Sequence, residues 1–93
     1  MIYEVKYTSQ FKRSYKLMAK QGQDLSLIDE VIDQLRKGEK LDWKYRDHAL
    51  KGNHSGYREC HTKPDWLLIY LIDNDVLTLT LVDTGSHSKI LNL

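Results

Sequence analysis

The stretch "WLLIYLI", Trp66–Ile72, decides the fold of this 93-residue chain. It is an uninterrupted apolar run, with Pro64 and Asp65 before it and Asp73 and Asn74 after it. Short apolar runs bounded by turn residues are typical of a strand that is buried on both faces. The sequence therefore predicts a sheet whose central strand is Trp66–Ile72.

Three other stretches alternate between polar and apolar residues, as half-buried strands do. They are Ile2–Tyr7, Gly56–Lys63 and Val76–Val82. Because successive side chains of a strand point to opposite faces, each stretch has one face suited to a core. The second stretch places Tyr57, Glu59 and His61 on one face and Arg58, Cys60 and Thr62 on the other.

Two amphipathic helices are predicted between the first strand and the rest of the sheet. The segments "SQFKRSYKLMAKQG" and "SLIDEVIDQLRKG" repeat apolar residues at helical spacing, with charged residues opposite. Two such helices in tandem form a helical hairpin. The apolar stripes consist of Phe11, Tyr15 and Met18 in the first helix, and of Ile28, Val31, Ile32 and Leu35 in the second.

Capping signals mark the ends of both helices. Thr8–Ser9 offers an N-cap for the first helix, and Gly22 is a suitable residue for its end. Ser26 with Asp29 resembles a capping box at the start of the second helix, and Gly38 suits its end. The helices should therefore occupy the two segments between these residues.

The predicted order is β-α-α-β-β-β, with an irregular connection over Leu41–Asn53. Three strands that follow one another form an antiparallel meander, so we expect an α+β fold. The helical hairpin needs an apolar cover, and one face of the sheet is its natural partner. Residues 1–93 are expected to form a single domain, which leaves the other face or rim of the sheet for a site.

Composition points to a cytoplasmic protein without a membrane span. The single cysteine excludes an intrachain disulfide, and the longest apolar run is far below the roughly 18 residues of a membrane helix. Residues 1–23 contain five Lys or Arg against one acid, and residues 43–66 contain five against three. These two basic segments suit a polyanionic partner, although a solvated helix face and a basic loop explain the same charge.

The histidines are concentrated in two stretches. Three of the four lie in "DHALKGNHSGYRECHTKPDW", residues 47–66, and the fourth lies in "DTGSHS", residues 83–88. His48, His54 and His61 lack the closely spaced pairs that metal sites usually show, so we expect no metal and no cofactor. Cys60 and His61 are adjacent on a strand and point apart, so Cys60 is expected to be a buried apolar residue rather than a nucleophile.

Acid–base cleavage of RNA needs the residue types that these stretches contain. Two histidines near neutral pH serve as base and acid, and a cation stabilises the charged phosphorane. RNA supplies the nucleophile through its own 2′-hydroxyl, and Trp66 or Tyr57 offers a surface on which a base can stack. Structural roles explain the same residues: a histidine in a loop, Arg58 paired with a carboxylate of the sheet, and Trp66 in the core.

Three motifs resemble those of a known family. They are "YRDHALKG" at Tyr45–Gly52, "YRECHTKPDWLLIY" at Tyr57–Tyr70 and "TGSHS" at Thr84–Ser88. With them, the chain resembles bacterial type II toxins of the RelE/ParE superfamily, in its YafQ branch, over nearly its whole length. The resemblance implies a RelE-like fold and a toxin that acts as a ribosome-dependent endoribonuclease. Such a toxin cleaves mRNA by metal-independent acid–base catalysis with attack by the 2′-hydroxyl.

The resemblance also implies a set of site residues. His87 is our first choice for the acid that protonates the leaving group, and the base is left open among the others of the catalytic group. Glu59 and Trp66 belong to the same motifs as supporting residues, and four cations are candidates for contact with RNA. The implied catalytic residues are His48, His61, Asp65 and His87, and the candidate cations are Lys51, Arg58, Lys63 and Lys89.

One departure from the family pattern bears on activity. The family typically has an arginine just before the "TGSHS" motif, where this chain has Asp83, and the family's late aromatic residue is missing, with Leu91 nearby. Loss of a transition-state donor commonly costs about 10²–10³ in rate. Either another cation replaces it or the nuclease is weakened. The alternative is a non-catalytic toxin of this fold that poisons gyrase or only binds an antitoxin or DNA.

The resemblance implies macromolecular partners as well. A cognate antitoxin of the DinJ/RelB type is expected to cover apolar surface that the small core leaves free. The ribosome and mRNA are the expected targets, and operator DNA is reached through the antitoxin.

Overall fold

The strand β4, Trp66–Asp73, lies in the middle of the sheet. The structure is a computed structural model, and it describes residues 2–52, 55–64, 66–73 and 78–86. Within these residues five strands form one sheet in the order β1-β5-β4-β3-β2, with β1 parallel to β5 and the other neighbours antiparallel. The α+β fold and the central strand are confirmed. The other strands are β1 (Glu4–Tyr7), β2 (His48–Ala49), β3 (Arg58–Lys63) and β5 (Thr78–Ser86).

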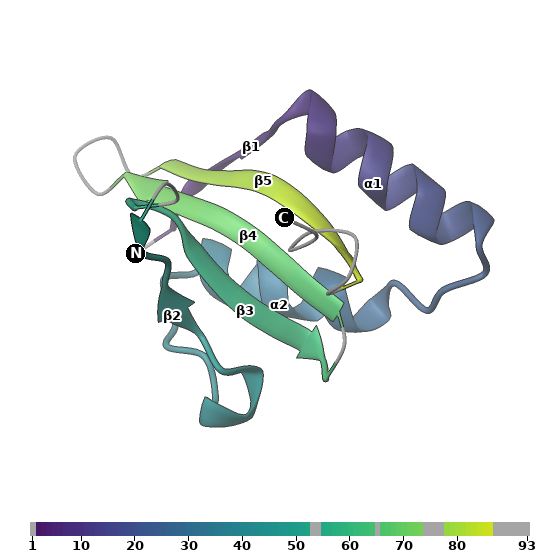
Figure 1. Cartoon of the computed structure of the whole chain (residues 1–93). Coiled ribbons are helices and arrows are strands. Elements are labelled where there is room, and N and C mark those ends of the chain that lie inside the picture. Colours follow the sequence, from purple (N-terminus) through teal and green to yellow (C-terminus); the bar gives the residue numbers. More distant parts are fainter. Residues whose placement is uncertain (1, 53–54, 65, 74–77, 87–93) are drawn as a thin grey trace.

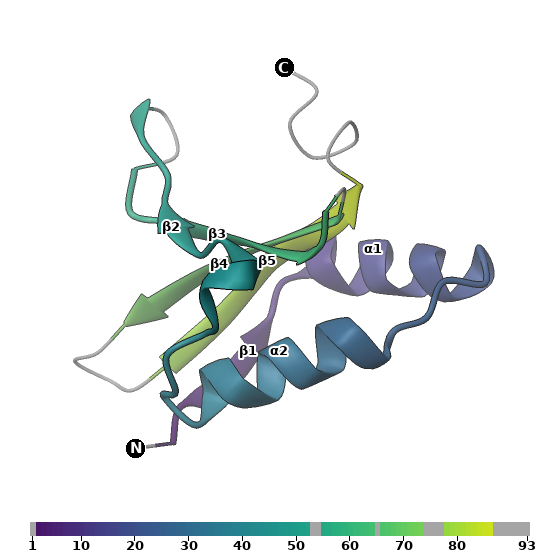
Figure 2. The same cartoon turned by 90° about the horizontal axis from the view of Figure 1, so that it is seen from below.

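Both helices, α1 (Ser9–Lys20) and α2 (Ser26–Arg36), cover the same face of the sheet (Figure 1; Figure 2). Their apolar stripes enter one core with the alternate residues of β3 and β4 that face them, including Cys60, Leu68 and Tyr70. Cys60 is fully buried, as expected for an apolar role, and burial raises the pKa of its thiol. The side chains of Glu59 and His61 therefore belong to the opposite face of the sheet.

Local signals explain where α1 begins and where both helices end. The hydroxyl of Thr8 accepts a hydrogen bond from the backbone N–H of Phe11 at 3.0 Å. Gly22 and Gly38 have φ angles of 75° and 73°. The N–H of each glycine and the N–H of the residue after it donate to carbonyl oxygens of the last helical turn, which closes the helix. The predicted capping box was wrong: Leu25 is the N-cap of α2, and the Asp24 carboxylate accepts from the N–H of Ser26 at 2.9 Å instead.

The connection predicted as irregular contains two short elements. A 3₁₀ helix, η1 (Trp43–Tyr45), is followed by the two-residue strand β2, which pairs with β3 and places His48 opposite Glu59. Elements of two or three residues are too short to produce a periodic pattern, so the sequence could not reveal them. The last strand also differs, because β5 extends through Thr84 to Ser86 beyond the predicted end at Val82.

No helix in the described residues has the length and apolar character to cross a membrane.

Replacement of Gly22 tests the helix end without disturbing packing. A Cβ at Gly22 meets no atom within 4 Å, so the cost of Gly22→Ala comes only from the left-handed backbone. We expect Gly22→Ala to lower the free energy of unfolding by about 1 kcal/mol, measured by urea denaturation. Gly22→Asn should lose less, because asparagine tolerates this conformation. Equal losses for the two variants would contradict this explanation.

Candidate active site

Two of the predicted catalytic histidines converge on the buried carboxylate Glu59. The Nε2 atom of His48 lies 3.5 Å from Oε1 of Glu59, and the Nε2 atom of His61 lies 3.8 Å from the same oxygen. The pairing of β2 with β3 brings His48 to this position, whereas His61 reaches it by the two-residue repeat of β3. The His48–Glu59–His61 cluster thus combines residues from two strands on the face that the helices leave uncovered.

Glu59 is poorly solvated for a group that can be charged. Its side chain is 4% exposed, against 50% for His48 and 15% for His61. In the described part of the chain, Oε2 of Glu59 is buried without a hydrogen-bond partner. A buried carboxylate is stabilised by nearby positive charge far more than an exposed one. His48 and His61 are placed to supply that positive charge when an imidazole is protonated.

Backbone carbonyls orient both imidazole rings. His48 Nδ1 lies 2.8 Å from the carbonyl oxygen of Arg46, and His61 Nδ1 lies 3.2 Å from that of Pro64. Since a carbonyl can only accept, each Nδ1 is the donor and carries a proton. The exchangeable position on each ring is therefore Nε2, the atom that faces Glu59.

A second polar group ties the segment before β2 to the sheet. The Nε and Nη2 atoms of Arg58 donate to Oδ1 of Asp47 at 2.8 and 2.6 Å, and the Tyr70 hydroxyl donates to the other oxygen of Asp47. Burial opposes the charge of Arg58, but its bonds with Asp47 and Tyr70 outweigh burial and raise the pKa of the guanidinium. Burial and the bond to Asp47 also raise the pKa of Tyr70. We call these three residues the Asp47 clamp.

The structure separates two predicted residues from His48 and His61. Arg58 is engaged in the Asp47 clamp on the helix-covered side, next to Tyr70 and Ile72, and so fits the structural role. Trp66 borders a hollow with Met18 and Leu27 on that same side. Neither residue reaches the His48–Glu59–His61 cluster.

Several other predicted residues cannot be placed in the cluster. Lys63 lines a hollow together with His61, whereas Lys51 is exposed after β2. The backbone of Asp83 lies in β5 opposite Ile69. Asp65, His87, Lys89 and Leu91 lie outside the described residues, as does His54, so their predicted roles stay predictions.

Sequence reasoning missed Arg46 and Lys44. Arg46 has a left-handed backbone, with φ 50° and ψ 43°, and its carbonyl oxygen orients His48. Both side chains line the same hollow as His61 and Lys63. In the sequence, both residues belong to the basic segment 43–66, and Arg46 also lies inside the motif "YRDHALKG". Its backbone conformation could not be predicted, because arginine does not mark left-handed positions as glycine or asparagine does.

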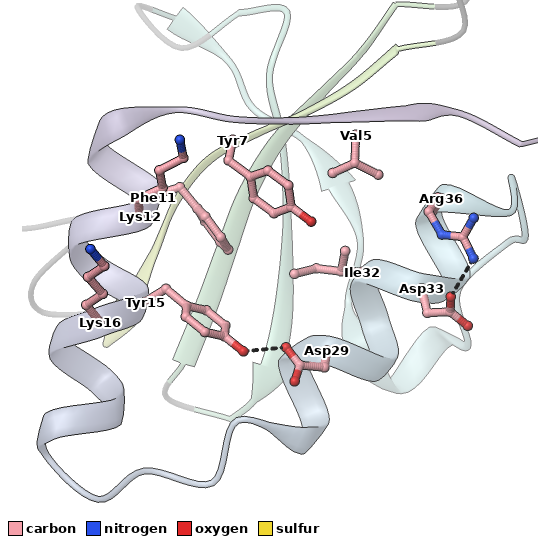
Figure 3. A pocket seen from close by; sticks show the side chains of 10 residues that line it. All are labelled: Val5, Tyr7, Phe11, Lys12, Tyr15, Lys16, Asp29, Ile32, Asp33 and Arg36. Atoms are coloured by element: carbon pink, nitrogen blue, oxygen red, sulfur yellow. Dashed lines mark hydrogen bonds and ion pairs between the residues drawn. The ribbon is translucent and has the colours of Figure 1, made fainter.

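A separate groove lies between β1, α1 and α2 (Figure 3). It encloses about 500 Å³ and contains an aromatic row, with ring centroids 5.8 Å apart for Tyr7 and Phe11 and 5.7 Å apart for Phe11 and Tyr15. The Tyr15 hydroxyl donates to Asp29 at 2.8 Å, and burial together with this bond raises the pKa of Tyr15 to about 12. Tyr15 and Ile32, predicted as core residues, are only half-buried because they face this groove.

The described residues contain no group of three His, Cys, Asp or Glu side chains arranged to hold a metal ion.

A family model for the bacterial toxin YafQ of type II toxin-antitoxin systems matches residues 3–92. The chain belongs to the YafQ family. It is 31% identical over 88 residues to the mRNA interferase toxin YafQ of Escherichia coli K12, an alignment that covers 94% of each chain. The YafQ resemblance and the RelE/ParE-type fold are thus confirmed.

Solved structures of bacterial toxins superpose closely on this chain. A metal-bound toxin from Helicobacter pylori has a TM-score of 0.87 and 41% identity, covering 97% of this chain and 99% of that one. YafQ in the Escherichia coli DinJ-YafQ complex has a TM-score of 0.88 and 30% identity, covering 97% and 98%. The antitoxin DinJ is therefore bound to a protein of the same architecture.

The Asp47 clamp generates a prediction about the position of His48. Asp47→Asn leaves a partly buried arginine without its counter-charge, so we expect the free energy of unfolding to fall by about 1–2 kcal/mol. Because Asp47 directly precedes His48, cleavage of RNA should fall as well. The control is Asp33→Asn, which removes an exposed ion pair with Arg36 and Lys37 and should change both readouts much less. Equal effects of the two variants would exclude the clamp as a positioning element.

Proposed function

We propose that this chain is the mRNA interferase toxin of a type II toxin-antitoxin system and cleaves mRNA on the ribosome by metal-independent acid–base catalysis. The observation that carries the proposal is the convergence of two imidazole Nε2 atoms on one buried carboxylate. The mRNA interferase activity of the Escherichia coli relative supports it.

The reaction requires two proton transfers at one phosphodiester. The 2′-oxygen of the ribose loses its proton to a base and forms a bond to phosphorus. The bond from phosphorus to the 5′-oxygen breaks, and an acid protonates that oxygen. The products are a 2′,3′-cyclic phosphate and a 5′-hydroxyl. An Nε2 atom of His48 or His61 has the exchangeable position that a base needs.

Glu59 supports the base electrostatically. When Nε2 takes the proton of the 2′-hydroxyl, the imidazole becomes positively charged within 4 Å of the Glu59 carboxylate. A buried carboxylate stabilises that charge as it forms, much as the aspartate of a catalytic triad does. Glu59 therefore acts through the histidines and is a positioning residue rather than the base itself.

We assign the acid to His87, with Asp65 as a supporting group. Ser86, the last described residue of β5, pairs with Trp66, and Trp66 pairs with Lys63. The strand β5 thus runs to the end of the sheet at which His61 lies. Its last residue, Ser86, directly precedes His87 in the sequence. This path supports a role for His87 at the same phosphodiester as His61.

Removal of His61 tests the catalytic proposal. We expect His61→Ala to lower single-turnover cleavage of ribosome-bound mRNA by about 10²–10⁴-fold, measured by mapping and quantifying new 5′ ends. The matched control is His54→Ala, since the sequence predicts His54 to be an exposed turn residue. The alternative is a non-catalytic toxin that poisons gyrase, which Asp83 favours. It is correct if the wild-type protein leaves mRNA intact and inhibits supercoiling by gyrase.

We propose that a cognate antitoxin of the DinJ/RelB type binds this chain. The proposed location is the cytoplasm, which also contains the ribosome, mRNA and antitoxin-bound operator DNA. The complex of Escherichia coli YafQ with DinJ supports this partner. The groove between β1, α1 and α2 is the surface we assign to it. Its row of aromatic side chains suits apolar residues, while Lys12 and Lys16 on its wall suit acidic ones (Figure 3).

The position of the groove makes the antitoxin assignment testable apart from catalysis. The groove adjoins β1 at one edge of the sheet, and the His48–Glu59–His61 cluster involves β2 and β3 at the other edge. A substitution in the groove should therefore affect antitoxin affinity without removing a catalytic group.

We expect Tyr7→Glu to weaken antitoxin binding by at least about tenfold, because it places a charge within the aromatic row and repels acidic side chains. Isothermal titration calorimetry with the cognate antitoxin measures the change. Leu17→Glu is the control, since Leu17 is exposed to a similar extent, 45% against 50%, but lies on α1 outside the groove. Equal weakening by both variants would remove the groove as the docking surface.

A further inference from the structure

The hollow beside His61 is lined by three cations from two separate segments. Lys44 and Arg46 come from η1 and its C-terminal cap, and Lys63 comes from the end of β3. Leu27 and Tyr45 add apolar surface, and the enclosed volume is about 390 Å³. η1 packs against β3, which holds the two segments together. We call this hollow the cationic pocket.

The charges of the three cations are not balanced within the described part of the chain. Across those ranges Lys44, Arg46 and Lys63 form no ion pair, in contrast to Arg36, Lys37 and Arg58. The pKa of Asp24 is lowered chiefly by its hydrogen bonds with Ser26 and to a smaller extent by the charge of Lys63, and Asp24 does not line the cationic pocket. Like charges gathered around one hollow repel one another until an anion occupies it.

Local structure holds the cations around the pocket. The Asp42 carboxylate caps η1 by accepting from the N–H of Lys44 at 3.0 Å, and the Lys44 ammonium lies 5.2 Å from the centre of the buried Tyr45 ring. Arg46 then adopts its left-handed conformation, which is unfavourable for a residue that has a side chain. This turn presents the Arg46 side chain to the pocket and its carbonyl oxygen to His48.

We propose that the cationic pocket binds a backbone phosphate of the mRNA next to the scissile phosphodiester. This inference rests on the proposed nuclease function, because His61 belongs both to the pocket and to the His48–Glu59–His61 cluster. A strand whose scissile phosphate lies at His61 places a neighbouring phosphate within reach of Lys44, Arg46 and Lys63. The apolar surface of Leu27 and Tyr45 suits the adjoining sugar or base.

The pocket also supplies positive charge near the substrate. The family typically has an arginine for this purpose at the position where this chain has Asp83. Arg58, a candidate for that charge from the sequence, is held by Asp47 and Tyr70 and does not line the pocket. Lys63 is thus joined by Arg46, which lies inside the motif "YRDHALKG", and by Lys44, which directly precedes that motif. Their task is to bind and orient the strand, not to transfer a proton.

The test compares two triple variants that remove the same amount of charge. One replaces the pocket cations by glutamine: Lys44→Gln, Arg46→Gln and Lys63→Gln. The control replaces Lys6, Lys20 and Lys40 by glutamine, which are exposed and lie outside the cationic pocket. Single-turnover cleavage is measured on ribosomes programmed with mRNA, as a function of toxin concentration and salt. Binding to ribosomes without mRNA is measured in parallel, and urea denaturation checks that each variant folds.

We expect the pocket variant to raise the half-saturating concentration by about tenfold or more, with a smaller effect on the rate at saturation. The dependence of log affinity on log salt should become shallower by about 0.7 for each phosphate that the variant no longer neutralises. The control variant should keep the wild-type half-saturating concentration and salt dependence.

Three results would overturn the inference. They are an unchanged half-saturating concentration in the pocket variant, an equal rise in the control variant, and an equal fall in affinity for ribosomes without mRNA. The last result would assign the pocket to ribosomal RNA. Failure of the proposed function looks different, because the wild-type protein then leaves mRNA uncut at every concentration.

Discussion

The candidate active site depends on one carboxylate, Asp47, that ties a two-residue strand to the rest of the sheet. β2 is too short to be stable by its own backbone pairing, and it lies at the edge of the sheet. Arg58 from β3 and Tyr70 from β4 both bind Asp47, so the residue before His48 is joined to two long strands. The position of His48 relative to Glu59 follows from this connection.

The charged residues on the two faces of the sheet have different roles. On the helix-covered face, Arg58 is neutralised by Asp47, and this pair serves the fold. On the other face, Glu59 is buried between two histidines, which are neutral or charged according to the protons they hold. An arginine in place of either histidine would satisfy Glu59 permanently, whereas an imidazole can give and take a proton near neutral pH.

The two surfaces proposed for partners lie at opposite edges of the sheet. The aromatic groove adjoins β1, and the cationic pocket and the histidines involve η1, β2 and β3. A single short segment bound in the groove therefore leaves the histidines uncovered. An antitoxin that blocks RNA as well must extend across the sheet or prevent entry to the ribosome by its bulk.

The sequence by itself determined the elements with strong periodicity and the family. The central strand, the two helices and the β-α-α-β-β-β order follow from apolar patterns, and the motifs around His48 and His61 identified the YafQ family. Only the tertiary structure decided that β2 pairs His48 with Glu59, that Arg58 serves a clamp, and that Trp66 lies away from His48 and His61. It also placed Arg46 beside His61 through a left-handed turn. The reason is that periodicity reports which face of a long element is buried, whereas contacts between distant short segments depend on strand register and on individual polar bonds that no local pattern encodes.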